Sequence, residues 1–359
     1  MIKVLIVEDS PVMQQLLAHT IATDADLEVV GIAGNGEEAI AAVEKYNPDV
    51  IAMDWHMPKL DGRQATRIIM ETNPTPIVIV SGSSVPTEMI SSFSLIEAGA
   101  LAIVKKPPSI DHPDYTKEMR ELNLTLKLMS EVKLVRRISR TPREPQPVKP
   151  LIEKLISKES EIQVVVIGAS TGGPMVLQKI LSRLPRNIQV PLLIVQHISQ
   201  GFTEGFVEWL NNTTDFPVHI ATDGEYPLPG HAYIAPDNLH MGIGRGSKII
   251  LSSHELESGL RPSVAYLFRT TAQVFGAKAV GILLTGMGRD GADDLKLMKD
   301  KGAITFAQDK ESSIVYGMPG EAEKLNAATF ILPPDDIITA LITLIKKMNG
   351  ELYEKQDEF

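Results

Sequence analysis

The chain has 359 residues, a length that predicts two domains, and its 43% hydrophobic and 22% charged residues are ordinary globular proportions. A net charge of -10 argues against non-specific binding to nucleic acid, and the absence of cysteine excludes disulfides, thiolate metal sites and cysteine nucleophiles. The start, MIKVLIVEDS, is too short and acidic for a signal peptide, and no apolar run approaches the ~18 residues of a membrane span. We therefore expect a cytoplasmic protein without direct membrane insertion.

Short apolar runs alternate with amphipathic stretches over the first 107 residues. The apolar runs are KVLIVED (3–9), EVVGIAG (28–34), DVIAMD (49–54), PIVIVSG (76–82) and LAIVKKP (101–107). Helix-like stretches lie between them at 13–22, 36–46, 62–72 and 88–100. Five βα units with continuous apolar strands predict a parallel sheet covered by helices on both faces.

A proline-rich stretch marks the boundary between the two halves. Residues 114–140 have a helical and increasingly basic pattern, and RTPREPQPVKP (140–150) then places four prolines in eleven residues. Such a stretch predicts an extended linker. We expect a first domain over 1–122, a helical and proline-rich basic linker over 123–160, a second domain over 161–348 and a polar tail over 349–359.

The second half resumes the α/β pattern. Its apolar runs are QVVVIG (163–168), VPLLIVQH (190–197), FPVHIA (216–221), HAYIAP (231–236), SKIILS (247–252), AVGILLTG (279–286) and AITFAQ (303–308). Helix-like stretches lie at 174–184, 263–276 and 290–302. The short runs between 216 and 252 favour antiparallel hairpins. The rest predicts a doubly wound, mainly parallel sheet.

Polar side chains gather where strands of the first domain end. Glu8 and Asp9 end the first strand, Asp54 the third, Ser81 the fourth and Lys106 the fifth. Ligand groups of open parallel sheets lie beyond the carboxyl ends of the strands, although single strand ends are often polar because they meet solvent. Three converging carboxylates suit Mg²⁺, a lysine and a hydroxyl would bind a phosphoryl group, and an aspartate can become an acyl phosphate.

The first domain resembles the receiver domain of two-component response regulators over about residues 1–120. The motifs that carry the resemblance are VEDS (7–10), MDWHMPKLDG (53–62), VSG (80–82) and VKKP (104–107). It implies a flavodoxin-like (βα)5 fold, a phospho-acceptor at Asp54, Mg²⁺ held by Glu8, Asp9 and Asp54, and support of the phosphoryl site by Ser81 and Lys106. Ile103 departs from the pattern, because many receivers have a switch aromatic there.

The turn GASTGG (168–173) follows an apolar strand and precedes a helix. It lacks the Lys-Ser/Thr of a P-loop, and Ser170 replaces the second glycine of G-x-G-x-x-G, so a dinucleotide site survives only as a degenerate alternative. The turn does match G-x-S-x-G in the strand-to-helix context of a nucleophile elbow. We therefore consider Ser170 a candidate nucleophile.

A serine nucleophile needs a base and a group that orients the base. His197 follows the apolar run VPLLIVQ at the expected edge of the sheet, and His240 is the reserve candidate. The remaining histidines have positions typical of the first domain, of strands or of a polar loop; they are His19, His56, His112, His219, His231 and His254. Asp290 lies just beyond another buried strand and would orient His197, unless it caps the helix that follows.

The second domain resembles the catalytic domain of the chemotaxis protein-glutamate methylesterases (CheB family). The resemblance rests on IGASTGGP (167–174), VQHI (195–198), YIAPDNLHM (233–241), LRPSV (260–264), LLTGMGRDGA (283–292) and AQDKESSIVYGMP (307–319). It implies a catalytic triad of Ser170, His197 and Asp290 without a cofactor for the ester chemistry. The implied partners are methyl-accepting chemoreceptors as substrates and the chemotaxis histidine kinase as phosphodonor. Deamidation of receptor glutamines is also implied, because an amide undergoes the same acyl transfer.

Two other classes of function stay open from the sequence. One is a receiver-controlled module that binds a nucleotide in the glycine turn without hydrolysis. The other is a DNA-binding response regulator, which the acidic charge and the lack of a helix-turn-helix pattern disfavour. Only the basic residues around the linker favour it, and a solvated hinge or a contact with an acidic receptor surface explains them better; they are Lys133, Arg136, Arg137, Arg140 and Arg143.

Overall fold

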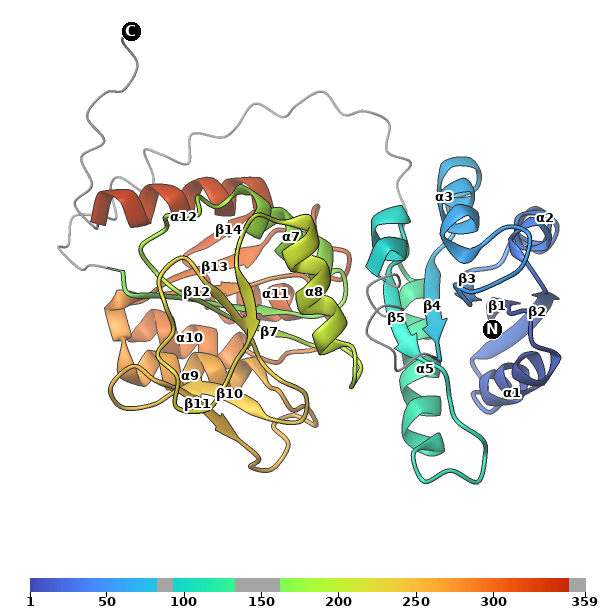
Figure 1. Ribbon diagram of the computed structural model, residues 1–359, viewed down its shortest axis with the longest axis horizontal. Coiled ribbons are helices and arrows are strands. Elements are labelled where there is room, and N and C mark those ends of the chain that lie inside the picture. The colour runs from blue at the N-terminus through green and yellow to red at the C-terminus, as the bar shows by residue number, and fades with distance from the viewer. Residues whose placement is uncertain (83–92, 133–161, 349–359) are drawn as a thin grey trace, which may run out of the picture. The chain divides into compact units, whose positions relative to one another are not determined.

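The computed structural model describes residues 1–82, 93–132 and 162–348, with side chains up to residue 345. The chain divides into two compact units, Met1–Thr141 and Pro142–Phe359. Each unit is built on its own parallel sheet (Figure 1), so the predicted two-domain α/β architecture is confirmed.

The first unit has a five-stranded parallel sheet with the order β2-β1-β3-β4-β5. The strands are β1 (Ile2–Val7), β2 (Leu27–Ala33), β3 (Val50–Met53), β4 (Ile77–Ser81) and β5 (Ala102–Lys105). The helices with defined bounds are α1 (Pro11–Ala22), α2 (Gly36–Tyr46), α3 (Gly62–Thr72) and α5 (Tyr115–Ser130). The predicted helix over 88–100 lies partly outside the described residues, and its residues 93–98 are helical.

Three helices of this unit begin at a residue that caps the free backbone N–H groups. The side-chain oxygen of Asn35 accepts from the Glu38 N–H at 3.1 Å, and that of Asp61 accepts from the Gln64 N–H at 2.8 Å. Ser10 caps α1 in the same way. Such caps each stabilise a helix start by about 1 kcal/mol and fix where the chain leaves the strand end.

Helix α5 extends the first unit beyond the predicted boundary at residue 122. Leu122, Leu126 and Met129 are fully buried, and the helix contacts β3, β4 and β5. The helical pattern over 114–140 therefore belongs in part to the core of the first unit, whereas we had assigned residues from 123 onward to the linker. Residues 133–160 of the predicted linker (123–160) and the predicted polar tail (349–359) lie outside the described residues.

The second unit has a seven-stranded parallel sheet with the order β14-β13-β12-β6-β7-β9-β8. Its strands are β6 (Val164–Ala169), β7 (Leu192–Gln196), β8 (Val218–Ile220), β9 (Ala232–Ile234), β12 (Ala279–Leu283), β13 (Ile304–Gln308) and β14 (Phe330–Leu332). Its helices are α7 (Gly173–Arg183), α8 (Thr203–Thr213), α9 (Val264–Val274), α10 (Ala292–Asp300), α11 (Met318–Lys324) and α12 (Pro334–Met348), with a short 3₁₀ turn at Gly276–Lys278.

The prediction of antiparallel hairpins between 216 and 252 is half right. Strands β10 (His240–Ile243) and β11 (Ile249–Ser252) form an antiparallel hairpin. Strands β8 and β9 instead join the main sheet in parallel, with β9 between β7 and β8. All three residues of β9 are buried, which is typical of an interior parallel strand rather than of a hairpin with one wet face.

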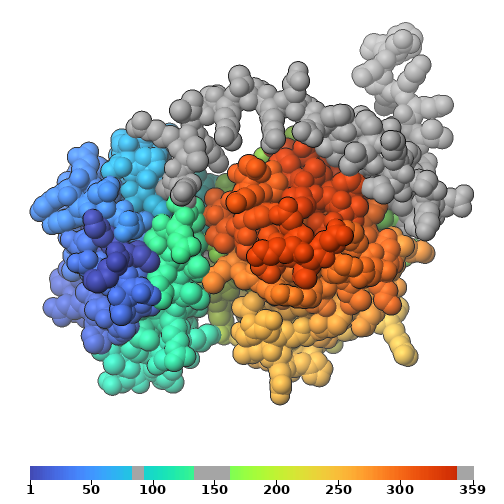
Figure 2. Space-filling model, turned by 180° about the vertical axis from the view of Figure 1, so that it is seen from behind, coloured from blue at the N-terminus to red at the C-terminus, as the bar shows by residue number. Residues whose placement is uncertain are grey.

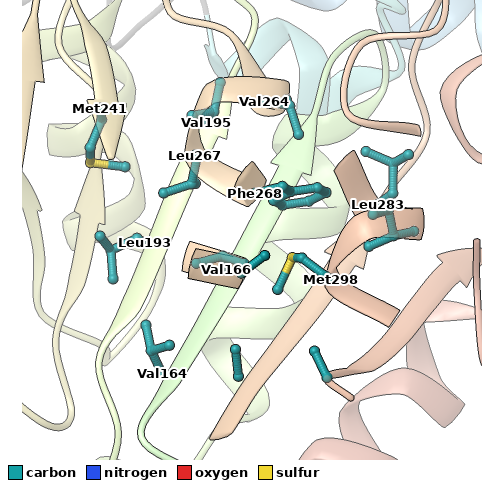
Figure 3. Packing of buried hydrophobic residues seen from close by; sticks show 14 of the residues in the cluster. Val164, Val166, Leu193, Val195, Met241, Val264, Leu267, Phe268, Leu283 and Met298 are labelled. Atoms are coloured by element: carbon teal, nitrogen blue, oxygen red, sulfur yellow. The ribbon is translucent and has the colours of Figure 1, made fainter. Parts of the chain in front are cut away.

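The core of the second unit lies between its sheet and a layer of helices. Val164 and Val166 of β6 and Leu193 of β7 face Phe268 of α9 and Met298 of α10 (Figure 3), and all five are fully buried. Burial of each such side chain contributes about 1.5–3 kcal/mol. Helices α9, α10 and α11 form this layer, whereas α7, α8 and α12 lie on the opposite face (Figure 1). Viewed from behind, the elements after β12 form most of the visible face of this unit (Figure 2).

Candidate active sites

The acidic residues predicted in the first unit lie together. Glu8, Asp9 and Asp54 each offer a carboxylate oxygen, and these three atoms lie within 4.8 Å of one another. Glu8 and Asp9 follow β1, and Asp54 follows β3. The strand order reverses direction between β1 and β3, and this is the point where doubly wound sheets bind ligands.

Lys106 is the cation of this pocket. Its Nζ lies 2.7 Å from Oε2 of Glu8 and 2.8 Å from Oδ2 of Asp54. Burial alone would lower the pKa of Lys106, but its bonds to Asp54 and Glu8 outweigh burial and raise that pKa. Burial raises the pKa of Glu8, and the neighbouring Asp54 adds to the effect. One lysine against three carboxylates leaves negative charge that a divalent cation can neutralise, so the donor set fits Mg²⁺.

A buried hydroxyl and a backbone donor complete the pocket. Ser81 is fully buried, and its Oγ has no hydrogen-bond partner among the described residues. The Trp55 N–H donates to Oδ1 of Asp54 at 2.8 Å. A buried hydroxyl without a hydrogen-bond partner is unfavourable unless a ligand bonds to it, and a phosphoryl oxygen would accept such a bond. Ile103 lies half-buried in β5.

The three residues predicted as a triad follow three adjacent strands of the second unit. Strand β6 lies between β7 and β12, and Ala169 is paired with Gln196 at the ends of β6 and β7. Ser170 and His197 are the next residues on each strand, and Asp290 lies in the loop after β12. The chain leaves β6 toward α7 on one face and β12 toward α10 on the other. The candidate site therefore lies at the switch point of the second sheet.

Asp290 and His197 contact one another directly. Nε2 of His197 lies 2.9 Å from Oδ2 of Asp290, and the side chains are 12% and 2% exposed. Nε2 of His197 makes no hydrogen bond of acceptable geometry among the described residues, so this contact is a close approach rather than a linear hydrogen bond. Because Nε2 faces the carboxylate, Nδ1 is the imidazole nitrogen left for another partner.

The carboxylate of Asp290 also caps the N-terminus of α9. It accepts from Ser263 Oγ at 2.8 Å, from the Val264 N–H at 2.7 Å and from the Ala265 N–H at 3.1 Å. Burial opposes ionisation of Asp290, but the contact with His197 and the backbone N–H donors outweigh it and hold its pKa below the usual range. The alternative anticipated from the sequence, a cap on the following helix, is not what forms: the N-cap residue of α10 is Gly291, and no side chain caps this helix.

The turn that carries Ser170 depends on close packing. Gly172 has a φ of 79°, and a Cβ there would lie 2.7 Å from side-chain carbons of Ile314. A Cβ on Gly286 would lie 2.7 Å from the Cβ of Ser170. Only glycine fits these two positions without displacing a neighbour, so the turn and the loop after β12 lie against one another.

Thr285 links that loop to the nucleophile turn. Its fully buried Oγ1 lies 2.9 Å from the Thr171 carbonyl and accepts from the Val315 N–H at 3.0 Å. The Thr285 N–H donates to Oε1 of Gln308 at 2.8 Å. The N–H groups of Thr171 and Met287 have no hydrogen-bond partner among the described residues, so both are free to bind an anion.

These supporting residues were not predicted from the sequence. Gln196, Thr285 and Gln308 are buried polar residues at the ends of apolar strands. A polar residue next to a candidate catalytic residue at a strand end was the signal that could have identified them. A buried polar side chain needs a hydrogen-bond partner, and near a candidate active site that partner is often a backbone group of a candidate catalytic residue.

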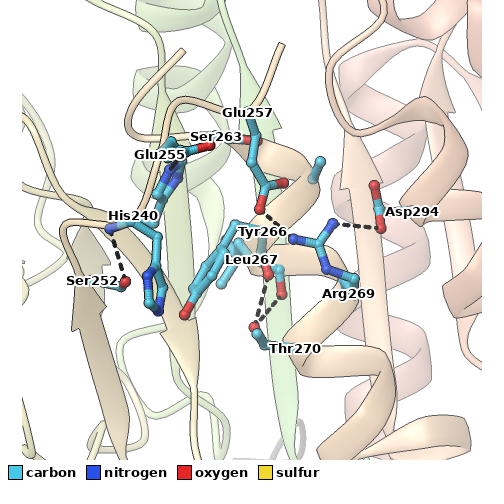
Figure 4. Close-up of polar contacts among 12 residues, drawn as sticks. His240, Ser252, Glu255, Glu257, Ser263, Tyr266, Leu267, Arg269, Thr270 and Asp294 are labelled. Atoms are coloured by element: carbon cyan, nitrogen blue, oxygen red, sulfur yellow. Dashed lines mark hydrogen bonds and ion pairs between the residues drawn. The ribbon is translucent and has the colours of Figure 1, made fainter. Parts of the chain in front are cut away.

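The other histidines lie in structural settings. His240 is fully buried, its Nε2 lies 3.0 Å from the Glu255 carbonyl, and its ring stacks on Tyr266 (Figure 4). The reserve candidate therefore faces a carbonyl instead of a carboxylate. His219 and His231 bond to each other at 2.7 Å.

An ionic cluster lies near Asp290. Arg269 of α9 contacts Glu257, and its Nη1 lies 3.4 Å from Oδ1 of Asp294 on α10 (Figure 4). Burial raises the pKa of Asp294 to about 6, and the charges of Glu257 and Asp290 contribute although Arg269 opposes them. Asp294, on the first turn of α10, therefore changes protonation state near pH 6.

Known proteins match this chain over nearly its whole length. Residues 165–341 match the family described as CheB methylesterase, and residues 4–113 match the response regulator receiver domain. A protein-glutamate methylesterase/protein-glutamine glutaminase of Nitrosospira multiformis is 54% identical over 96% of this chain and 97% of its own length. One of Syntrophus aciditrophicus is also 54% identical, over 96% and 98%.

A solved structure agrees with the second unit. The crystal structure of the Thermotoga maritima CheB methylesterase catalytic domain has 36% sequence identity and a TM-score of 0.50, and the match covers 51% of this chain and 99% of that one. Among the described residues, no helix is both long enough and apolar enough to span a membrane.

Proposed function

Because the chain belongs to the CheB methylesterase family, with a response regulator receiver domain in front, we propose that it is a protein-glutamate methylesterase that uses Ser170, His197 and Asp290. Its substrates are γ-glutamyl methyl esters on methyl-accepting chemoreceptors, and receptor glutamines are deamidated by the same acyl transfer. The observation that carries the proposal is the 2.9 Å contact between His197 and Asp290 at the strand ends beside Ser170.

The reaction proceeds through an acyl-enzyme. Oγ of Ser170 attacks the ester carbonyl while Nδ1 of His197 takes its proton, since Nε2 faces Asp290. The negative charge of Asp290 stabilises the imidazolium. Collapse of the tetrahedral intermediate expels methoxide, which takes the proton from His197 and leaves as methanol. Water then repeats the sequence, releasing the glutamate carboxylate and restoring Ser170. With a glutamine substrate the leaving group is ammonia.

The oxyanion of the tetrahedral intermediate needs donors beside Ser170. The N–H groups of Thr171 and Met287 are the candidates, because neither has a hydrogen-bond partner among the described residues and each belongs to a loop that packs on the serine. Removal of one such donor typically lowers kcat by about 10²–10³-fold.

The receiver pocket is proposed to accept a phosphoryl group on Asp54 from the chemotaxis histidine kinase. Glu8, Asp9 and Asp54 would hold Mg²⁺, which neutralises the charge that develops during transfer. Lys106, within 2.8 Å of Asp54, and the hydroxyl of Ser81 would bind the phosphoryl oxygens.

The tether between the domains suggests how phosphorylation controls the esterase. A receiver joined by a linker acts at high effective concentration and can cover the active site until phosphorylation shifts the balance toward an open form. The test is methanol release from methylated receptors, with and without a small phosphodonor and Mg²⁺. Asp54→Asn should abolish the stimulation, and deletion of residues 1–150 should give high activity without phosphodonor. Low activity of the deletion would refute inhibition by the receiver.

The same assay separates hydrolysis from binding. Methanol release that requires Ser170 supports the esterase. No release under either condition would favour a receiver-controlled binding module, in which Ser170→Ala would keep its ligand.

A further inference from the structure

We propose that Gln196 is a positioning residue that fixes the nucleophile and the base relative to one another through their backbones, an inference that rests on the triad proposed above. Gln196 is the last residue of β7, 4% exposed, and immediately precedes His197. Its Nε2 donates to the Ser170 carbonyl at 2.9 Å and to the His197 carbonyl at 2.7 Å. One side-chain amide thus joins the two reacting residues.

The two bonds replace a rung of the β ladder. In a parallel pair the rungs follow a fixed alternation, and here the His197 N–H donates to the Ala169 carbonyl. The next rung would run from the Thr171 N–H to the His197 carbonyl. Gln196 occupies that carbonyl instead. The ladder therefore ends one rung early, and the Thr171 N–H remains without a partner among the described residues.

The environment of Gln196 is unfavourable for stability alone. Its Oε1 is buried and has no hydrogen-bond partner among the described residues, and an acceptor left in this state typically costs about 1–3 kcal/mol. A Cβ on Gly173, the first residue of α7, would lie 2.2 Å from the same Oε1. An apolar residue would fill this space without leaving a buried acceptor unpaired. The presence of a glutamine here, packed against a position that must be glycine, is therefore what a positioning role predicts.

Because Gln196 contacts the backbone of Ser170 and His197 and not the substrate, its loss should lower kcat more than it raises KM. Both amide hydrogens are used on backbone carbonyls, which also fixes the orientation of the amide. Without them the turn at Ser170 and the chain at His197 lose their common anchor. A displacement of about 1 Å between reacting groups can lower a rate by about 10²-fold.

The test compares Gln196→Met, which keeps the side-chain length but has no donor, with Thr305→Val. Thr305 is a fully buried residue near the start of β13, away from the site, and its hydroxyl donates to the Ala327 carbonyl at 2.7 Å. Each full-length variant is assayed for kcat and KM in methanol release, for the rate of Ser170 labelling by a fluorophosphonate, and for urea unfolding. Rates are expressed per folded molecule.

We expect Gln196→Met to lower kcat and the labelling rate together by about 10–100-fold with KM within two-fold, and Thr305→Val to lose stability with kcat within two-fold. A kcat of folded Gln196→Met within two-fold of the parent overturns the inference. If Gln196→Met does not fold, Gln196→Asn, which is one methylene too short to span both carbonyls, is judged by the same limits. Failure of the parent itself to release methanol or to label at Ser170 would instead refute the proposed function.

Discussion

Replacing Asp290 with asparagine removes the charge of one carboxylate that has two tasks. Its oxygens accept from Ser263 Oγ, from the Val264 and Ala265 N–H groups, and face Nε2 of His197. Asparagine is nearly the same size but turns one oxygen into a donor. Whichever way the amide is oriented, an NH₂ group then faces at least one N–H or O–H donor in a site that is 5% exposed.

The expected losses of stability and of catalytic rate follow from these contacts. An unmade hydrogen bond in a buried site costs about 1–3 kcal/mol, and loss of a negative charge at a helix N-terminus costs about 0.3–1 kcal/mol. We therefore expect Asp290→Asn to lower the free energy of unfolding of the second domain by about 1–4 kcal/mol. Loss of the charge beside the imidazolium should lower kcat by roughly 10⁴-fold, as the same replacement does in a serine protease triad.

The assay pairs urea unfolding with methanol release at a temperature where the variant is folded. Asp293→Asn is the matched control, because the Asp293 side chain is 59% exposed and its carboxylate pairs with the surface residue Arg289, at 2.7 Å. An exposed pair contributes about 0–1 kcal/mol, so the control should change stability little and keep kcat within about two-fold. If Asp290→Asn is destabilised but keeps more than a third of kcat, the carboxylate only caps α9 and the triad is wrong.

Three further changes test other parts of the account. Burial raises the pKa of Asp294 to about 6 from 3.8, so its ionisation disfavours the folded state as pH rises from about 4 to 6. Asp294→Asn should therefore raise the free energy of unfolding at pH 8 by up to about 3 kcal/mol. In urea unfolding below about pH 4 this gain should vanish, because the carboxyl is then protonated in both states. Gly172→Ala should lower both thermal stability and kcat, because φ is 79° and a Cβ would lie 2.7 Å from Ile314; an unchanged melting temperature would contradict the close packing of the turn. Asp54→Asn should leave unstimulated methanol release in place but remove its increase by phosphodonor and Mg²⁺, and persistent stimulation would exclude Asp54 as the acceptor.

The parts of the fold that were predicted from the sequence are those where burial dictates composition. Strands β6, β7 and β12 are buried along their whole length and read as uninterrupted apolar runs. Polar residues that end such runs, Ser170 and His197 among them, lie at one edge because parallel strands share a direction. The order of the strands in the sheet then determines which of these strand ends lie next to one another.

The parts that were not predicted depend on tertiary contacts. The sequence predicts a hairpin at strand β9, because a three-residue strand gives too short a pattern to show that both of its faces are covered. Asp290 caps α9, whose first residue, Val264, lies 26 residues earlier in the chain. The role of Gln196 was not predicted from the sequence, because its two carbonyl partners are set by the pairing of β6 and β7.

The central claim, that Ser170 is the nucleophile of a phosphorylation-regulated methylesterase, is tested most directly by the rate of methanol release from methylated receptors by the parent and by Ser170→Ala. Ser182→Ala is the control, because Ser182 is exposed on α7 and its hydroxyl donates to the Lys179 carbonyl. We predict that phosphodonor with Mg²⁺ increases release by the parent and by Ser182→Ala, and that Ser170→Ala remains at the uncatalysed rate in both conditions. Release by Ser170→Ala at a rate comparable to that of the parent would contradict the account.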